Sequence, residues 1–163
     1  MKALILAIWL LAPLPALAQS LALTGPAGQR ATLSAADVAA LPRVKMTVDV
    51  RGVKHEYEGP LLIDVLAKAG APTGKDIHGA DLATVVLVTS SDGYQVAVGL
   101  AEADPGTRPN RIILADRSDG APLGPAAGPF QLVIEGDIRP ARSARMVSAI
   151  EVRRLSTGKT AAH

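Results

Sequence analysis

Glycine and proline divide this chain into short segments. The sequence contains 15 Gly and 12 Pro in 163 residues. Many of them stand between apolar runs, as at Gly25-Pro26, Gly59-Pro60 and Pro105-Gly106 and throughout residues 117–129. Because both residues disrupt regular helices and favour turns, the chain is expected to form short elements joined by tight connections.

The clearest strand pattern lies over residues 44–50, where apolar and polar side chains alternate. Alternation with a period of two predicts a half-buried strand. Arg51-Gly52 is expected to turn the chain into a second strand over residues 53–58, which gives a hairpin.

The remaining segments predict more strands than helices. Further strands are expected over residues 83–89, 94–98, 112–115, 130–134 and 146–153. Short helices are expected over residues 35–40, with Ser34 and Asp37 as a capping box, over residues 61–69, ended by Gly70, and as one turn over residues 100–104. The sum is an α+β or mostly β domain with mixed sheets.

The first 18 residues have the features of a secretory signal in the usual order. Lys2 supplies a positive charge, residues 3–11 an apolar region, and Ala16 and Ala18 the small residues before a cleavage site. We therefore expect cleavage before Gln19, and a periplasmic or secreted protein with no membrane-spanning segment left. Residues 19–155 would form a single domain, and residues 156–163 a disordered tail.

Composition limits the chemistry that the chain can perform. There are no cysteines, so neither a disulfide nor a thiolate metal ligand is available. The glycine-rich phosphate-binding motifs and the G-x-S-x-G elbow of serine hydrolases are also missing. The net charge is only +2, but the part from Arg139 onward holds six Lys or Arg and one acid. A local basic segment of this kind indicates an anion site rather than nucleic-acid binding.

Arg142, Ser143 and Arg145 are the candidate binding residues in that basic segment. They follow a glycine-containing loop and precede the last expected strand. Guanidinium groups match the shape of phosphate and carboxylate, and a serine hydroxyl adds a donor. The alternative is a solvated loop whose basic residues flank an apolar strand.

The order of segments resembles the molybdopterin-binding domain of the sulfite oxidase family. The matching residues lie between positions 44 and 153: Tyr57-Glu58-Gly59-Pro60-Leu61-Leu62, Leu66, Gly70, Ser91-Asp92-Gly93-Tyr94, Ile113-Leu114-Ala115-Asp116, Asp119-Gly120-Ala121-Pro122-Leu123, Gly128-Pro129, Leu132-Val133, Gly136, Arg142-Ser143-Ala144-Arg145 and Ile150-Glu151-Val152. The resemblance implies a fold of mixed, curved sheets with few helices. It also implies that Arg142, Ser143 and Arg145 lie against a pterin cofactor, with Arg145 where the family has lysine.

The resemblance and the missing cysteine together set the functional expectation. Enzymes of that family ligate molybdenum through a cysteine, and soft thiolate suits that metal. We therefore expect a non-catalytic binding module, with no catalytic or metal-ligating residues, for a small anionic ligand or an exported redox protein. The alternatives are a molybdopterin-dependent oxidoreductase with unusual metal ligation and a protein-interaction module of an exported redox system.

Overall fold

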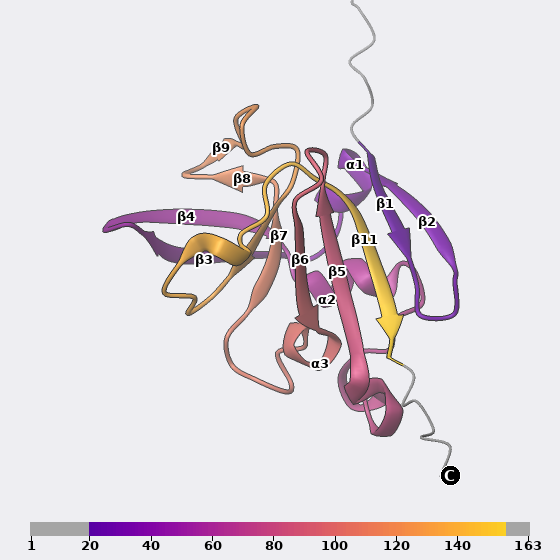
Figure 1. Cartoon of the computed structure of the whole chain (residues 1–163). Coiled ribbons are helices and arrows are strands. Elements are labelled where there is room, and N and C mark those ends of the chain that lie inside the picture. Colours follow the sequence, from indigo (N-terminus) through magenta and orange to yellow (C-terminus); the bar gives the residue numbers. More distant parts are fainter. Residues whose placement is uncertain (1–19, 156–163) are drawn as a thin grey trace, which may run out of the picture.

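A computed structural model describes residues 20–155, which form three β-sheets and a few short helices (Figure 1). The expected signal segment, Gln19 and the expected tail lie outside the described residues. The strands are β1 (Ser20–Thr24), β2 (Arg30–Ser34), β3 (Arg43–Val50), β4 (Val53–Pro60), β5 (Thr84–Ser90), β6 (Gln95–Gly99), β7 (Ile112–Ala115), β8 (Arg117–Ser118), β9 (Ala121–Pro122), β10 (Gln131–Ile134) and β11 (Val147–Arg154). The helices are α1 (Ala35–Ala39), α2 (Leu62–Ala67) and α3 (Leu100–Ala103), with 3-10 turns η1 (Gly74–Asp76), η2 (Gly79–Ala83) and η3 (Pro140–Arg142).

The largest sheet has five strands in the order β2-β1-β11-β5-β6. Within this sheet, the adjacent strands β1 and β11 run parallel to each other, and all other adjacent strands are antiparallel. A second sheet has the order β3-β4-β8-β9, and the third is the pair β7 and β10. The protein is therefore mostly β with mixed sheets and few short helices, which confirms the expected fold class at this level.

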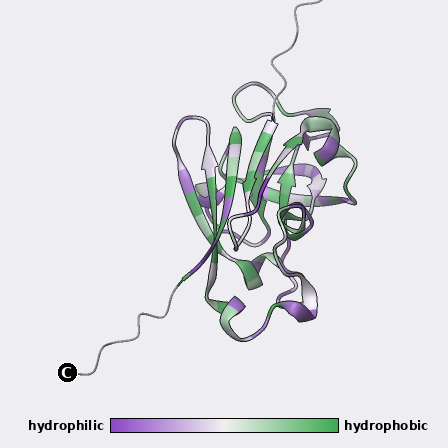
Figure 2. Cartoon of the chain, turned by 90° about the vertical axis from the view of Figure 1, so that its right-hand side faces the viewer, coloured by the Kyte–Doolittle hydropathy of each residue, from purple (hydrophilic) through white to green (hydrophobic). Residues whose placement is uncertain are grey.

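Strands β7 and β10 are buried along their whole length, and their side chains enter two different apolar clusters. Ile112, Leu114, Leu132 and Ile134 belong to the larger cluster, which packs against the five-stranded sheet and α2. Ile113, Ala115 and Val133 belong to the smaller cluster, with Met46 and Tyr57 of the β3–β4 hairpin. Successive side chains of a strand point to opposite faces, so this pair forms the layer shared by both clusters. Figure 2 shows hydrophobic stretches along the central strands and hydrophilic residues at turns and short helices.

The β3–β4 hairpin has the turn that the sequence predicts. Val50 pairs with Val53, so Arg51 and Gly52 form a two-residue connection. Both have positive φ angles, 57° and 86°, as the tight turns of hairpins require. The side chain of Asp49 supports the turn by accepting a hydrogen bond of 2.6 Å from the Gly52 N–H.

The helix-end signals are also confirmed. Ser34 and Asp37 form the capping box of α1: the Ser34 N–H donates to the Asp37 carboxylate at 2.8 Å, and the Asp37 N–H donates to the Ser34 hydroxyl at 3.2 Å. Gly70 follows α2 with φ 78°, the left-handed conformation that ends a helix. Four side chains of α2 are buried, namely Leu62, Ile63, Val65 and Leu66.

Four strands were not predicted, namely β1, β2, β8 and β9. Strand β2 has an arginine, two threonine or serine residues and only two apolar side chains, none of them fully buried. Strands β8 and β9 have two residues each and lie within residues 117–129, which the sequence analysis treats as a loop. Strand β8 exists because it pairs with β4 across the fold, a partner that local sequence does not reveal.

None of the helices in the described part of the chain has the length and hydrophobicity needed to cross a membrane.

Gly59 brings β4 against β7 more closely than any side chain would allow. A Cβ atom added at Gly59 would lie 2.1 Å from the Leu114 carbonyl oxygen and 2.7 Å from the Ala115 Cα. Both obstacles are backbone atoms, so the two strands would have to separate. We expect Gly59→Ala to lower the free energy of unfolding by about 3 kcal/mol, measured by urea denaturation.

Gly124→Ala is the matched control, because no atom lies within 4 Å of the position of its added Cβ. It should change stability by less than about 0.5 kcal/mol. If both variants lowered the free energy of unfolding by the same amount, the close approach of β4 and β7 would not be the reason for a glycine at position 59.

Candidate functional site

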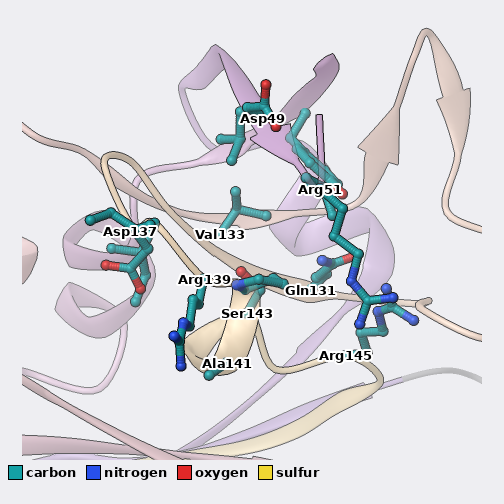
Figure 3. Close-up of a pocket in the computed structure, with 15 residues that line it drawn as sticks. Asp49, Arg51, Gln131, Val133, Asp137, Arg139, Ala141, Ser143 and Arg145 are labelled. Carbon is teal, nitrogen blue, oxygen red and sulfur yellow. The ribbon is translucent and has the colours of Figure 1, made fainter. Parts of the chain in front are cut away.

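A cleft of about 580 Å³ lies between the turn of the β3–β4 hairpin and the segment from Asp137 to Arg145. Strands β4 and β10 contribute Tyr57, Gln131 and Val133 to its wall. We name it the arginine cleft, because Arg51, Arg139 and Arg145 line it (Figure 3). Figure 3 shows Arg51 and Arg145 extending toward the same end of the cleft, with Arg139 on the other side of Ser143.

The inner wall of the arginine cleft is rigid and partly apolar. Tyr57 and Val133 are buried and belong to the smaller apolar cluster. Their place in paired strands fixes the position of this wall relative to the arginines. The cleft therefore combines an apolar surface with charged groups at its rim.

The three arginines of the cleft have no carboxylate partner within residues 20–155. Six other arginines of the same part of the chain are ion-paired: Arg43, Arg108, Arg111, Arg142, Arg153 and Arg154. Three of the five arginines without an ion pair in this part of the chain thus line one cleft, the other two being Arg30 on β2 and Arg117 on β8. Five donors on each group point to the binding of an oxyanion.

Two acids also line the arginine cleft, but each already accepts hydrogen bonds. The Asp49 carboxylate accepts from the Gly52 N–H, as described above. The Asp137 carboxylate accepts two hydrogen bonds from Arg142, at 3.0 and 2.6 Å. Since the charge of Asp137 is balanced by Arg142, the arginines determine the sign of the charge in the cleft.

Gln131 adds a polar amide group to the wall of the arginine cleft. The residue is 5% exposed, and its side chain makes no hydrogen bond to any other part of residues 20–155. Within residues 20–155, the fully buried side-chain polar atoms without a partner are Thr84 Oγ1 and Ser90 Oγ, so the Gln131 amide is not cut off from the cleft. It is a donor and acceptor that a ligand in the cleft can reach. Figure 3 shows Gln131 between Ser143 and Arg145.

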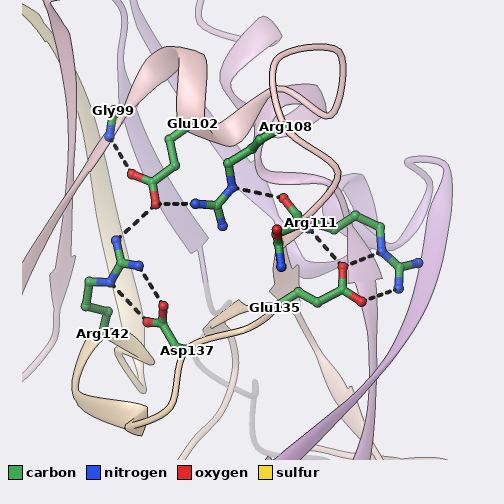
Figure 4. A network of polar contacts seen from close by, with 8 residues as sticks. Gly99, Glu102, Arg108, Arg111, Glu135, Asp137 and Arg142 are labelled. Carbon is green, nitrogen blue, oxygen red and sulfur yellow. Dashed lines mark hydrogen bonds and ion pairs between the residues drawn. The ribbon is translucent and has the colours of Figure 1, made fainter.

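Of the residues that the sequence singled out, Ser143 and Arg145 line the cleft, whereas Arg142 does not. The Arg142 guanidinium donates to Asp137 and, at 3.1 Å, to Glu102 at α3 (Figure 4). The hydrogen bonds to Asp137 raise the pKa of Arg142. Its side chain thus ties the segment before β11 to α3.

Glu102 is the centre of this network. Besides Arg142, its Oε1 accepts from Arg108 at 3.0 Å, and its Oε2 accepts from the Gly99 N–H at 3.3 Å. A neighbouring pair joins Arg111 and Glu135 through two side-chain hydrogen bonds of 3.0 and 2.8 Å. Both groups hold residues that follow β10, namely Glu135, Asp137 and Arg142, and so they anchor the segment that carries Arg139 and Arg145.

The stability that the Arg111–Glu135 pair contributes depends on pH through the Glu135 carboxyl group. Its hydrogen bonds lower the pKa of Glu135 from 4.5 to about 2. The folded protein thus gains stability from this carboxylate above pH 4.5 and loses it as the pH falls through about 2.

Sequence reasoning missed Arg51, Arg139 and Gln131 as site residues. Arg51 stands about 90 positions before Arg139 in the chain, and only the tertiary fold brings the hairpin turn beside it. Gln131 lies within an apolar strand and carries no local signal. The sequence predicted a turn at Arg51-Gly52 but not the residues that lie beside Arg51 in the fold.

The described part of the chain holds no group of three His, Cys, Asp or Glu side chains arranged to bind a metal ion. Within residues 20–155, the arginine cleft offers Arg, Gln, Ser and Tyr as hydrogen-bonding groups besides the two engaged acids. These residues fit an anionic group such as a phosphate. They do not fit molybdenum ligation of the kind that the family resemblance implies, because the chain contains no thiolate.

Comparisons with known proteins support the fold. Neither the profiles of protein families nor the curated proteins gave a sequence match. Among solved structures, the chain is similar to the sulfane dehydrogenase SoxCD from Paracoccus pantotrophus, with a TM-score of 0.64 and 14% identity. The match covers 85% of this chain and 39% of that one, so the chain spans about two fifths of the length of the structure it matches. At this identity the similarity concerns the fold.

We expect Arg142→Ala to destabilise the segment before β11. Removing the guanidinium leaves Asp137, whose side chain is 18% exposed, without its partner. The free energy of unfolding should fall by about 1–2 kcal/mol in urea denaturation.

Arg153→Ala removes an exposed ion pair with Glu151 and serves as the control. It should change stability by less than about 0.5 kcal/mol. If Arg142→Ala were no more costly than Arg153→Ala, the network would not support the segment.

Proposed function

We propose that this protein is a non-catalytic binding module that holds a small oxyanion or an anionic organic ligand in the arginine cleft. The observation that carries the proposal is the gathering, in one cleft, of three guanidinium groups without carboxylate partners in the described chain, beside the amide of Gln131. Charge-assisted hydrogen bonds from such groups are about twice as strong as neutral ones. The module belongs outside the cytoplasm if residues 1–18 act as the expected export signal.

The chemistry of the cleft favours anions that combine several acceptor oxygens with a small apolar part. Ser143 adds a hydroxyl donor beside the arginines, and Tyr57 and Val133 form the apolar wall. Organic sulfonates and phosphate esters both have this character. The similarity to a sulfane dehydrogenase makes sulfur oxyanions a natural set of test ligands for the charged part of the site.

The alternative function is a molybdopterin-dependent oxidoreductase. It rests on the resemblance to the sulfite oxidase family and on the fold shared with a sulfane dehydrogenase. The arginines and Ser143 suit the phosphate of a pterin cofactor, and such a cofactor would supply redox chemistry to the site. The missing cysteine argues against ligation of its metal.

Elemental analysis separates the two functions. A binding module purified from its exporting host should contain no stoichiometric molybdenum. About one molybdenum per chain would support the oxidoreductase instead.

We expect isothermal titration with sulfate, thiosulfate and phosphate at low salt to show binding that weakens as NaCl is added. Replacing Arg51, Arg139 or Arg145 by Ala should each weaken binding by about tenfold, since each loses one or more charge-assisted hydrogen bonds. Circular dichroism should show the folded state of every variant, because these three side chains are exposed.

Arg30→Ala is the matched control. Arg30 is exposed and has no ion pair within residues 20–155, but it lies on β2 and not on the cleft. It should bind as the unmodified protein does. Equal binding by the Arg145→Ala and Arg30→Ala variants would contradict the proposal and leave these arginines as ordinary solvated charges.

A further inference from the structure

The arginine cleft continues past Arg145 into a second compartment of about 380 Å³. Tyr57, Gln131 and Arg145 line both spaces. We call the second space the histidine compartment, because His55 of β4 and its partner Asp119 of the β8–β9 turn line it. The two compartments thus form one binding region with Arg145 between them.

Asp119 fixes the orientation of the His55 ring. The Asp119 Oδ2 lies 2.8 Å from His55 Nδ1, and the Ser118 hydroxyl donates to the same oxygen at 3.3 Å. Asp119 is itself anchored to Glu56: its Oδ1 accepts from the Glu56 N–H at 2.9 Å, and its own N–H donates to the Glu56 carbonyl at 2.7 Å. The ring therefore presents its other nitrogen, Nε2, away from Asp119.

His55 Nε2 is available to a ligand. It makes no hydrogen bond to any residue between positions 20 and 155, and the side chain is 35% exposed. A histidine whose Nδ1 is held by a carboxylate has a defined tautomer and ring position, which is the usual way in which proteins orient a functional imidazole.

The charged and titratable groups that face His55 are few. Asp119 approaches from the β8–β9 turn, and Arg145 from the segment before β11. Tyr57 lies on the same face of β4, with its ring centroid 6.3 Å from that of His55. Strand β3 places the apolar Val48 opposite His55, and the other lining residues of the compartment are not titratable.

We propose that His55, held by Asp119, is a second ligand-binding group, so that the site takes a dianion with one anionic group at the arginines and the other at His55. This inference rests on the proposed function and specifies its ligand class. The arginines bind the first group. Protonated His55 donates from Nε2 to the second group.

The proposal predicts in which direction the affinity for a dianion changes with pH. The hydrogen bond from His55 lowers the pKa of Asp119, so that carboxylate stays ionised in neutral and mildly acidic solution. Imidazole side chains change charge between about pH 5 and 8. Protonation takes the His55–Asp119 pair from a net negative charge to neutral and provides a donor at Nε2. A dianion should therefore bind more tightly at the lower pH.

Propane-1,3-disulfonate is a suitable probe, because both sulfonates stay ionised over this range. We expect isothermal titration to give an affinity about tenfold higher at about pH 5.5 than at about pH 8. His55→Gln removes the titrating group and should bind equally at both pH values. His78→Gln is the matched control, since His78 is exposed before η2 and lines neither compartment, and it should keep the full pH dependence.

Histidine NMR signals provide a second measurement that does not rely on a variant. Adding the disulfonate at about pH 5.5 should shift the ring-proton signals of His55 and leave those of His78 in place. A pH dependence that survives in His55→Gln, or unshifted His55 signals during arginine-dependent binding, would overturn this inference while leaving the arginine cleft intact. No binding at either pH, or binding insensitive to Arg145→Ala, would instead contradict the proposed function itself.

Discussion

The burial of β7 and β10 on both faces is the constraint on which the rest of the structure depends. Their side chains alternate between the two apolar clusters, so each strand helps to hold the five-stranded sheet and the β3–β4–β8–β9 sheet together. The chain leaves β10 directly into the segment that carries Asp137, Arg139 and Arg145. The position of the arginine cleft therefore follows from core packing, with Gln131 and Val133 of β10 in its wall.

Electrostatics separates the arginines into two groups with different roles. Arg43, Arg111 and Arg142 bind carboxylates from distant parts of the chain and hold elements together. The arginines of the cleft have exposed side chains and no such partners within the described chain. This difference, rather than the total charge, indicates a ligand site, because a net charge of +2 is small for a chain of this size. The basic segment noted in the sequence contains members of both groups. Arg142 forms an ion pair with Asp137 and holds the segment in place, whereas Arg139 and Arg145 line the cleft.

Local signals in the sequence predicted the elements that local chemistry determines. Alternation over residues 44–50, the Arg51-Gly52 turn, the Ser34 cap and Gly70 all work through neighbours in the chain, and the structure confirms each. Strand β8 and the pairing of His55 with Asp119 depend on residues about 60 positions apart, which no local pattern encodes. The same reason explains the site: Ser143 and Arg145 were found through the basic segment, but Arg51 and Gln131 needed the tertiary fold. Residue type alone did not distinguish Arg142, whose guanidinium turns to Asp137, from Arg145, which turns to the cleft.

The parallel pairing of β1 with β11 has a consequence for how the chain reaches its native state. It joins the first described strand to the last, with Ala22 opposite Ala149, and places β11 in the middle of the five-stranded sheet between β1 and β5. A chain growing from its N-terminus cannot complete this sheet until β11 has been synthesised. Until then β1 and β5 both remain open edges, and the closing contact spans a long loop, which slows folding and leaves time for a chaperone to bind.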